Sequence, residues 1–363
     1  MTEFQLFDTK HKTLNLQEPA TMRILSQGIA TTQFLIFGRK QFTQTGYLNH
    51  TKQYKDPVQS CAVVKNDNIP DGVDLTGKTI LISGANQGIG KEIATYAAAK
   101  NANVYMLCRN QERAQSAQEE IQNLTNNPNV NILLADVSEP AQIKRIVDEF
   151  EKKETKLDCL ICNAGALFND RQVNSEGMEM TFMGHLVSGT YQLTKMMMPR
   201  LKAAGQEARV VFVSSGGMYN TKFPEWDVAA SSGKHESSFS GNLAYAYAKR
   251  GQVLLAERFT KEYPDVSFVS AHPGWVRTAG VDSAYGSQAK YLEPMRTAWE
   301  GAEGICWLMA TARKNLEGGA YYLDRMPQRK HIGGLFMSEG SFTKNTEEEV
   351  NIMMQNLEKC SGV

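Results

Sequence analysis

Tyr245 and Lys249 are separated by four positions, so on a helix their side chains share one face. A tyrosine hydroxyl, with an ordinary pKa of about 10, is a poor acid or base at neutral pH unless its anion is favoured. A lysine ammonium one helical turn away favours that anion by charge. The spacing recurs by chance on many helices, but here it follows a buried strand and Ser215. The pair therefore predicts proton transfer to or from a carbinol oxygen, with Tyr245 as the acid-base.

Ser215 follows the apolar run 210–213, which is predicted to be a strand. Its hydroxyl would hydrogen-bond the substrate oxygen and stabilise the developing alkoxide. Ser214 is the alternative, because alternation along a strand lets only one of the two serines face the site. Tyr247 is not a second acid-base candidate, because position 251 is a glycine and offers it no lysine partner.

A glycine-rich turn follows the predicted strand 79–82 and opens a helix over about 89–100. Its glycines permit a tight turn, close approach of a pyrophosphate to the backbone, and close packing of helix on strand. The helix N-terminus then meets the phosphate charge. A glycine pattern alone is weak, but the strand before it and the helix after it make a dinucleotide site the better interpretation. The candidate cofactor-binding residues of the turn are Gly84, Asn86, Gln87, Gly88, Ile89 and Gly90.

Arg109 bears on which dinucleotide is bound. It follows the second predicted strand, 104–108, where an NAD enzyme normally has an acidic residue for the ribose 2′-hydroxyl. A guanidinium suits a 2′-phosphate instead. The alternative is a solvated arginine in a loop. We expect NADP (NADPH), with NAD the less favoured cofactor.

Strands and helices alternate from Leu75 onward, and this pattern predicts right-handed crossovers and a parallel sheet. The fold class is therefore α/β, a Rossmann-type doubly wound sheet in a single domain over residues 76–326. An N-terminal extension, 1–75, and a C-terminal helical extension, 327–363, flank it. The predicted strands are 79–82, 104–108, 131–135, 157–162, 210–213, 266–270 and 320–323.

The N-terminal extension contains an apolar segment at partly helical spacing over 24–42, and no acidic residue lies between Glu18 and Asp56. A helix of this kind could lie on an anionic membrane surface. Packing on the protein's own body or on a protein partner is the favoured alternative.

At the other end of the chain, Thr346 is expected to cap a helix that starts with three glutamates.

Net charge gives no argument for nucleic-acid binding, because the chain has 39 basic residues (lysine plus arginine) and 39 acidic residues (aspartate plus glutamate).

Cys159 and Cys162 lie on a predicted buried strand and are interpreted as core cysteines rather than a metal or redox pair. No metal site is predicted. Because no secretory signal or apolar run of membrane-spanning length is recognised, we expect an intracellular protein in a reducing compartment, cytoplasmic or organelle-associated.

Taken together, the motifs S-G-A-N-Q-G-I-G, C-N-A-G, V-S-S, Y-A-Y-A-K and H-P-G-W-V-R-T resemble those of the short-chain dehydrogenase/reductase superfamily over roughly 75–325. Segment 37–47 narrows the likeness to the branch called dehydrogenase/reductase family member 12. The resemblance implies that Lys249 and Tyr245 also contact the cofactor. It implies further cofactor contacts at Asp136, Val137, Asn163, Ala164, Gly165, Pro273, Gly274, Val276 and Thr278.

His185 is the main departure from that pattern, because the superfamily usually has an asparagine there that continues the proton relay to the lysine. Histidine could relay protons near neutral pH, or it could be a satisfied core residue. The resemblance implies a carbonyl or alcohol substrate and a homodimer. An apolar substrate is indicated by four large side chains: Met218, Trp226, Trp275 and Tyr285. The alternative function is a non-catalytic dinucleotide-binding subunit of a larger or membrane-associated assembly.

Overall fold

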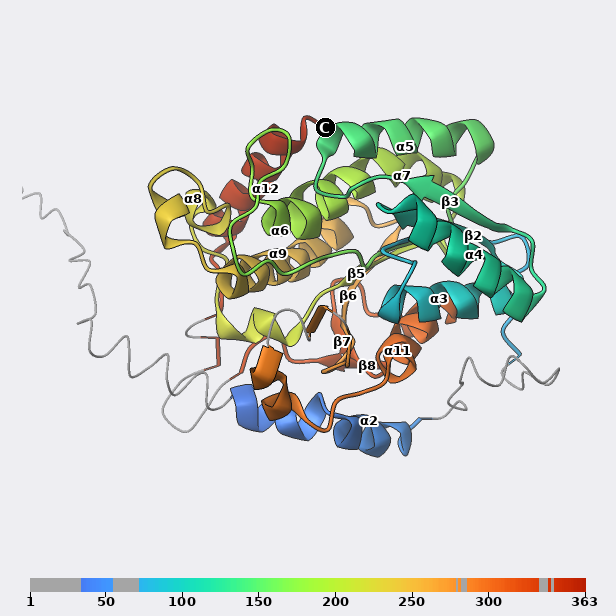
Figure 1. The fold of residues 1–363 in the computed structure, drawn as a ribbon, viewed down its shortest axis with the longest axis horizontal. Coiled ribbons are helices and arrows are strands. Elements are labelled where there is room, and N and C mark those ends of the chain that lie inside the picture. The colour runs from blue at the N-terminus through green and yellow to red at the C-terminus, as the bar shows by residue number, and fades with distance from the viewer. Residues whose placement is uncertain (1–33, 55–71, 279, 282–285, 333–338, 341–342) are drawn as a thin grey trace, which may run out of the picture.

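A computed structural model describes residues 34–54, 72–278, 280–281, 286–332, 339–340 and 343–363. Within these residues the strands form a single sheet in the order β3-β2-β1-β4-β5-β6-β7-β8 (Figure 1). All neighbouring strands are parallel except β7 and β8, which are antiparallel. The strands are β1 (Thr79–Ser83), β2 (Asn103–Cys108), β3 (Val130–Leu134), β4 (Cys159–Cys162), β5 (Arg209–Val213), β6 (Ser267–His272), β7 (Tyr321–Leu323) and β8 (Met326–Gln328).

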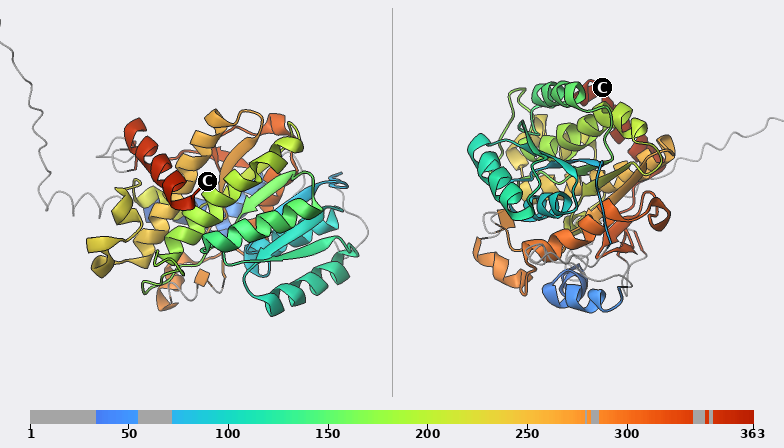
Figure 2. Two further views of the ribbon diagram at one scale, coloured as in Figure 1. Left: turned by 90° about the horizontal axis from the view of Figure 1, so that it is seen from above. Right: turned by 90° about the vertical axis from the view of Figure 1, so that its right-hand side faces the viewer.

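Helices cover both faces of the sheet, which explains why its central strands are continuously apolar. Helices α3, α4 and α11 cover one face, and α5, α7, α9 and α12 cover the other (Figures 1 and 2). The helices of these layers are α3 (Gly88–Ala99), α4 (Gln111–Thr125), α5 (Pro140–Lys153), α7 (Leu193–Ala203), α9 (Gly241–Glu262), α11 (Ala298–Ala310) and α12 (Glu347–Ser361). The α/β doubly wound prediction is confirmed.

The strand order reverses between β1 and β4, where the chain crosses from one half of the sheet to the other. In doubly wound sheets, ligands bind at this switch point, outside the carboxyl ends of the strands. The residues that follow β1, β4 and β5 are therefore brought to one edge. These are the segments that carry the glycine turn, Asn163 and Ser215.

Cys159 and Cys162 are both buried in β4, and their side chains belong to the cores on opposite faces of the sheet. Burial raises the pKa of each thiol to about 12. A thiol that keeps its proton is a poor nucleophile and a poor metal ligand. The interpretation of the pair as core cysteines is confirmed.

The helical segment that carries His185 is not a regular α-helix. It begins as α6 (Met180–Phe182), widens into the π-helix η2 (Met183–Gln192), and continues as α7. Side-chain hydroxyls bond carbonyls five positions earlier: Ser188 Oγ donates to Met183 O at 3.2 Å, and Thr190 Oγ1 to His185 O at 2.6 Å. π-helical turns are rare and are frequently found at functional sites.

The C-terminal segment is part of the sheet and core rather than an appendix, and the expected boundary at 326/327 falls inside β8. Asp324 and Arg325 connect β7 to β8 with positive φ angles of 51° and 66°, the conformation of a two-residue hairpin turn. Helix α12 buries Val350, Met353 and Leu357 against the α5/α9 face. The capping box that Thr346 forms with Glu349 confirms the expected helix start.

The described part of the N-terminal segment is a helix over 34–41, followed by α2 (Gln44–Thr51). Phe34, Phe37 and Phe42 pack against a cluster that includes Tyr219. This packing agrees with the favoured alternative, a helix on the protein's own body; residues 24–33 lie outside the described part. No described helix has both the length and the hydrophobicity of a membrane span.

Candidate active site

The glycine turn at the end of β1 has the conformation that its residue types require. Gly84 and Gly88 have φ angles of 69° and 54°, in the left-handed region that side chains disfavour. A Cβ on Gly90 would overlap the carbonyl oxygen of Gly84, so the helix can approach the strand only with glycine at that position. Gly88 is different: the nearest atom to a Cβ there is Thr278 Cγ2, at 3.7 Å. The backbone at Gly88, where α3 begins, is thus open to a ligand.

The segment after β4 is fixed to this turn by hydrogen bonds. The Ser83 hydroxyl accepts from the backbone N–H groups of Asn163 and Ala164, at 3.0 and 2.9 Å. Asn163 Nδ2 donates to Ser83 O at 2.9 Å. The Ser83 hydroxyl therefore joins the two segments.

Arg109 and Asp136 follow β2 and β3, so neighbouring strands bring them to the same edge. Arg109 Nη1 lies 3.6 Å from Asp136 Oδ2, and the arginine side chain is 59% exposed. Asp136 Oδ1 accepts from the backbone and hydroxyl of Ser138, which holds the carboxylate in place. The exposed guanidinium can turn toward an anion at this edge.

Tyr245 lies near the start of α9 and beside the turn that follows β5. That turn is the short helix η3 (Gly216–Asn220), and Ser215 caps it by accepting from the Gly217 N–H at 3.2 Å. A Cβ on Gly217 would lie 3.7 Å from the Tyr245 ring. Ser214 faces away and donates its hydroxyl to Lys249 O at 2.8 Å. Ser215 is therefore the serine beside Tyr245.

Lys249 is buried next to Tyr245, with its ammonium 5.4 Å from the centroid of the tyrosine ring. Lys249 Nζ donates to Val213 O at 2.6 Å and to Gln252 Oε1 at 3.2 Å. Burial lowers the pKa of Lys249 to about 7. The lysine can therefore gain or lose a proton near neutral pH.

His185 also packs against Tyr245, with ring centroids 5.0 Å apart and the rings nearly perpendicular. Its Nε2 is 3.1 Å from Ala166 O, which can only accept, so Nε2 carries the proton. Nδ1 is buried and has no partner among the described residues. Burial, reinforced by Lys249, lowers the pKa of His185 well below its usual value. The ring is thus neutral at neutral pH, and only one of its two nitrogens has a hydrogen-bond partner among the described residues.

Gln252 connects the lysine to the π-helix, a role that sequence reasoning missed. Its Oε1 accepts from Lys249, while its Nε2 donates to His185 O at 2.7 Å and to Thr190 Oγ1 at 3.1 Å. The only sequence signal is its position three residues after Lys249, on the same helical face. The amide thus links the lysine directly to the segment that carries His185.

The loop after β6 carries Pro273, Gly274, Val276 and Thr278. Gly274 has a φ angle of 82°, and its N–H donates to His272 Nδ1 at 3.1 Å. Thr278 reaches the glycine turn at Gly88. The fold therefore brings this loop to the edge that holds the glycine turn. The cofactor roles of these four residues stay predictions.

The aromatic and methionine residues taken as a hint of an apolar substrate are occupied in packing. Met218 is buried and its sulfur accepts from Arg250 at 3.3 Å. Trp226 packs on Phe182, with ring centroids 5.1 Å apart. Trp275 packs on the N-terminal segment, and Tyr285 lies outside the described residues. Packing accounts for Met218, Trp226 and Trp275, so these three residues give no evidence of an apolar substrate.

Comparisons with known proteins show which family the chain resembles. The pattern that describes the family "short chain dehydrogenase" matches residues 78–226. Human dehydrogenase/reductase SDR family member 12 is 34% identical over 297 residues, covering 81% of this chain and 88% of the relative. Human retinol dehydrogenase 12 is 35% identical over 208 residues, covering 57% of this chain and 64% of the relative.

Solved structures share the fold. A protein from Mycobacterium paratuberculosis has a TM-score of 0.59 and 19% identity, covering 85% of this chain and 98% of the other. A short-chain dehydrogenase from Escherichia coli CFT073, solved with NADPH, has a TM-score of 0.54 and 22% identity. That likeness covers 68% of this chain and 96% of the other.

Proposed function

The chain belongs to the short-chain dehydrogenase/reductase family of oxidoreductases, and we propose that it interconverts a carbonyl and an alcohol with NADP(H). The observation that carries the proposal is the convergence of Ser215, Tyr245 and Lys249 beside a glycine turn that is open at Gly88. Human retinol dehydrogenase 12, to which the chain is similar, is named for an alcohol substrate, which supports this reaction class.

The residues at the edge of the sheet fit a dinucleotide. The left-handed Gly88 leaves backbone space at the N-terminus of α3, and the first N–H groups of a helix have no partner within it. Those groups and the helix dipole suit a pyrophosphate. Arg109, exposed after β2, suits a 2′-phosphate. The adenine end would lie near Asp136 and the nicotinamide end near Tyr245.

When bound, the cofactor would supply the hydride for reduction of a carbonyl, and the residues around Tyr245 would manage the charge and the proton on its oxygen. The C=O electron pair moves to oxygen, which takes the hydroxyl proton of Tyr245 and becomes an alcohol. Ser215 donates a hydrogen bond to the same oxygen and stabilises its developing charge. The Lys249 ammonium stabilises the tyrosinate that remains. Gln252 holds that ammonium against the π-helix.

The decisive experiment follows NADPH oxidation by the purified protein over a panel of aldehydes and ketones. We expect turnover of at least one compound, and Tyr245→Phe should lower kcat/KM by about 10²–10⁴ while NADPH still binds. Tyr247→Phe is the matched control, because it removes a hydroxyl from the same helix without touching the proposed centre. Tight NADPH binding without turnover of any compound would instead favour the non-catalytic alternative.

Arg109→Ala tests the choice of cofactor. Loss of a charge-assisted contact should weaken NADPH binding by about tenfold to a hundredfold and leave NADH binding nearly unchanged. Dissociation constants of both nucleotides, measured by fluorescence titration, give the comparison. Equal affinity for the two cofactors in the wild type, unaffected by the substitution, would refute NADP preference.

A further inference from the structure

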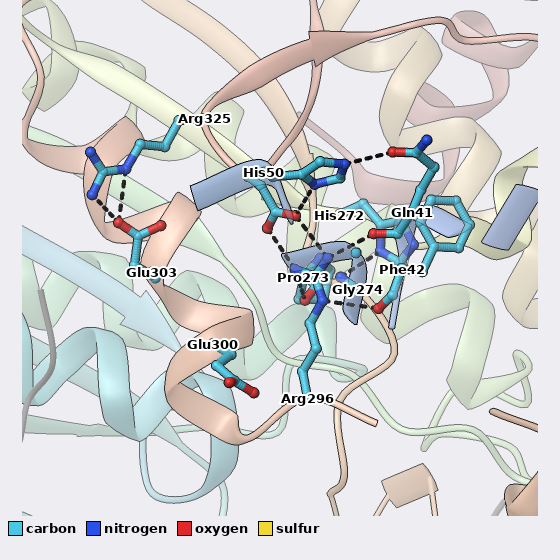
Figure 3. Close-up of polar contacts among 12 residues, drawn as sticks. Gln41, Phe42, His50, His272, Pro273, Gly274, Arg296, Glu300, Glu303 and Arg325 are labelled. Atoms are coloured by element: carbon cyan, nitrogen blue, oxygen red, sulfur yellow. Dashed lines mark hydrogen bonds and ion pairs between the residues drawn. The ribbon is translucent and has the colours of Figure 1, made fainter. Parts of the chain in front are cut away.

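Arg296 is fully buried between the N-terminal segment and the loop that follows β6. Its guanidinium forms a two-pronged ion pair with Asp324, with N–O distances of 2.5 and 2.7 Å (Figure 3). It also donates to Phe42 O and Gln41 O, each at 2.9 Å. Burying a guanidinium is costly unless its donors are satisfied. Here those donors join the N-terminal segment to the sheet.

The loop over 273–278 is held by the same group of contacts. Trp275 N donates to Phe42 O at 2.7 Å, and Trp275 O accepts from Arg296 N at 2.7 Å. A Cβ on Gly274 would overlap the Arg296 side chain, so the guanidinium fills the space beside this glycine. The loop is therefore in contact with both Phe42 and Arg296.

The N-terminal side of this junction is itself fixed by buried polar contacts. His50 Nδ1 lies 2.7 Å from Asp324 Oδ2, and its Nε2 lies 2.6 Å from Gln41 Oε1. The Phe42 ring packs on the ring of His272, with centroids 4.3 Å apart. Asp324 in the β7–β8 turn thus contacts both His50 of α2 and Arg296 in the segment before α11.

The loop also touches both halves of the candidate active site. Beside Ser215, a Cβ on Gly216 would lie 3.0 Å from His272 Nε2, where the loop starts. At the other end, Thr278 is the nearest residue to the Cβ position of Gly88. A dinucleotide that extends from the glycine turn to Tyr245 must pass along this loop.

We infer that residues 34–54 are a working part of the dinucleotide site: acting through Arg296, they position loop 273–278 against the nicotinamide half of the cofactor. This inference rests on the proposed function. Arg296 touches neither substrate nor reacting atoms in this scheme, and is a positioning residue. The N-terminal segment would then contribute to cofactor affinity without contacting the glycine turn.

The test compares two ligands, NADPH and adenosine 2′,5′-bisphosphate, which carries the adenine half and the 2′-phosphate but no nicotinamide. Arg296→Lys replaces a planar fork with a single ammonium that cannot satisfy the same carbonyls. We expect its dissociation constant for NADPH to rise about tenfold or more, and that for the bisphosphate to stay within about twofold. Equal weakening of both ligands, or of neither, would overturn the inference.

Gly38→Ala is a second variant, in case Arg296→Lys does not fold. A Cβ there would lie 2.5 Å from the Trp275 ring, so it separates the segment from the loop without touching Arg296. The same selective loss of NADPH affinity is expected. Lys40→Ala, at an exposed position of the same helix, is the matched control and should bind both ligands like the wild type.

Hydrogen exchange separates this inference from the proposed function. The N–H groups of Trp275 and Arg277 are bonded to Phe42 O and Arg296 O, so both variants should exchange them faster in the absence of ligand. If the wild type binds neither nucleotide, the proposed function fails, and the exchange rates alone decide the positioning role. Unchanged exchange in both variants would then overturn it.

Discussion

The Lys249 side chain is buried, and burial destabilises its charged form. Two hydrogen bonds hold it, to Val213 O and Gln252 Oε1, but burial still lowers its pKa from 10.5 to about 7. A bound substrate anion or tyrosinate would restore the charged form, because an opposite charge nearby favours it. Lys249 is therefore prepared to take up a proton when such a ligand binds.

This shift makes a prediction for stability. Between pH 7 and 10.5 the unfolded chain keeps a proton on Lys249 that the folded chain has lost, so the free energy of unfolding rises with pH. The contribution is about 1.4 kcal/mol per pH unit inside that window. Urea unfolding of the wild type and Lys249→Met at about pH 7.5 and about pH 9 should show the wild type gaining about 2 kcal/mol relative to the variant. A difference that does not change with pH would contradict the assignment.

His185 and Gly165 make a second prediction at the residue scale. A Cβ on Gly165 would overlap the His185 ring, which is buried. Gly165→Ala alone should therefore cost about 1–3 kcal/mol of unfolding free energy through overpacking. His185→Ala removes the obstacle, so the double variant should be more stable than the sum of the two single effects.

The double-mutant cycle measures that coupling by denaturant unfolding. A coupling of at least about 0.5 kcal/mol is expected, and strict additivity would mean that the two residues do not touch in solution.

Because the pKa of His185 lies well below its usual value, His185→Asn should leave the shape of the kcat/KM profile unchanged between about pH 6 and pH 8.

At the scale of elements, α12 starts at a capping box whose two halves are both present. Thr346 Oγ1 accepts from Glu349 N at 3.1 Å, and Glu349 Oε2 accepts from Thr346 N at 3.0 Å. Thr346→Ala should lower the free energy of unfolding by about 1 kcal/mol, since the helix loses a partner for its first N–H groups. Thr346→Ser keeps the oxygen and serves as the control. Thermal unfolding of both variants checks the difference.

At the scale of the whole molecule, the burial of the C-terminal helix leads us to expect that it unfolds together with the sheet. Leu357 is fully buried in the core of the α5/α9 face, whereas Ile352 on the same helix is 48% exposed. Leu357→Ala should cost about 2–5 kcal/mol, a large share of a typical domain's stability. Ile352→Ala should cost less than about 1 kcal/mol. Similar small losses in both variants would mean that α12 is not docked in solution.

The sequence by itself determined the parallel strands β1 to β7, the glycine turn and the spacing of Tyr245 and Lys249, but not the antiparallel edge strand β8. Each of these depends on local chemistry: a continuous apolar run, glycines at fixed offsets, or two residues one helical turn apart. The two core cysteines and the start of α12 could be predicted for the same reason. These features concern residues that are neighbours in the chain as well as in space.

Only the tertiary structure decided how Gln252 bridges Lys249 to the π-helix and where the N-terminal segment lies. The contact between Arg296 and Phe42 joins residues 254 positions apart, and that between Gln252 and His185 joins residues 67 positions apart. Such pairs leave no periodic signal, because a single buried donor and its carbonyl partner need no particular spacing. The packing of Met218, Trp226 and Trp275, which the sequence suggested might face a substrate, was decided at the same level.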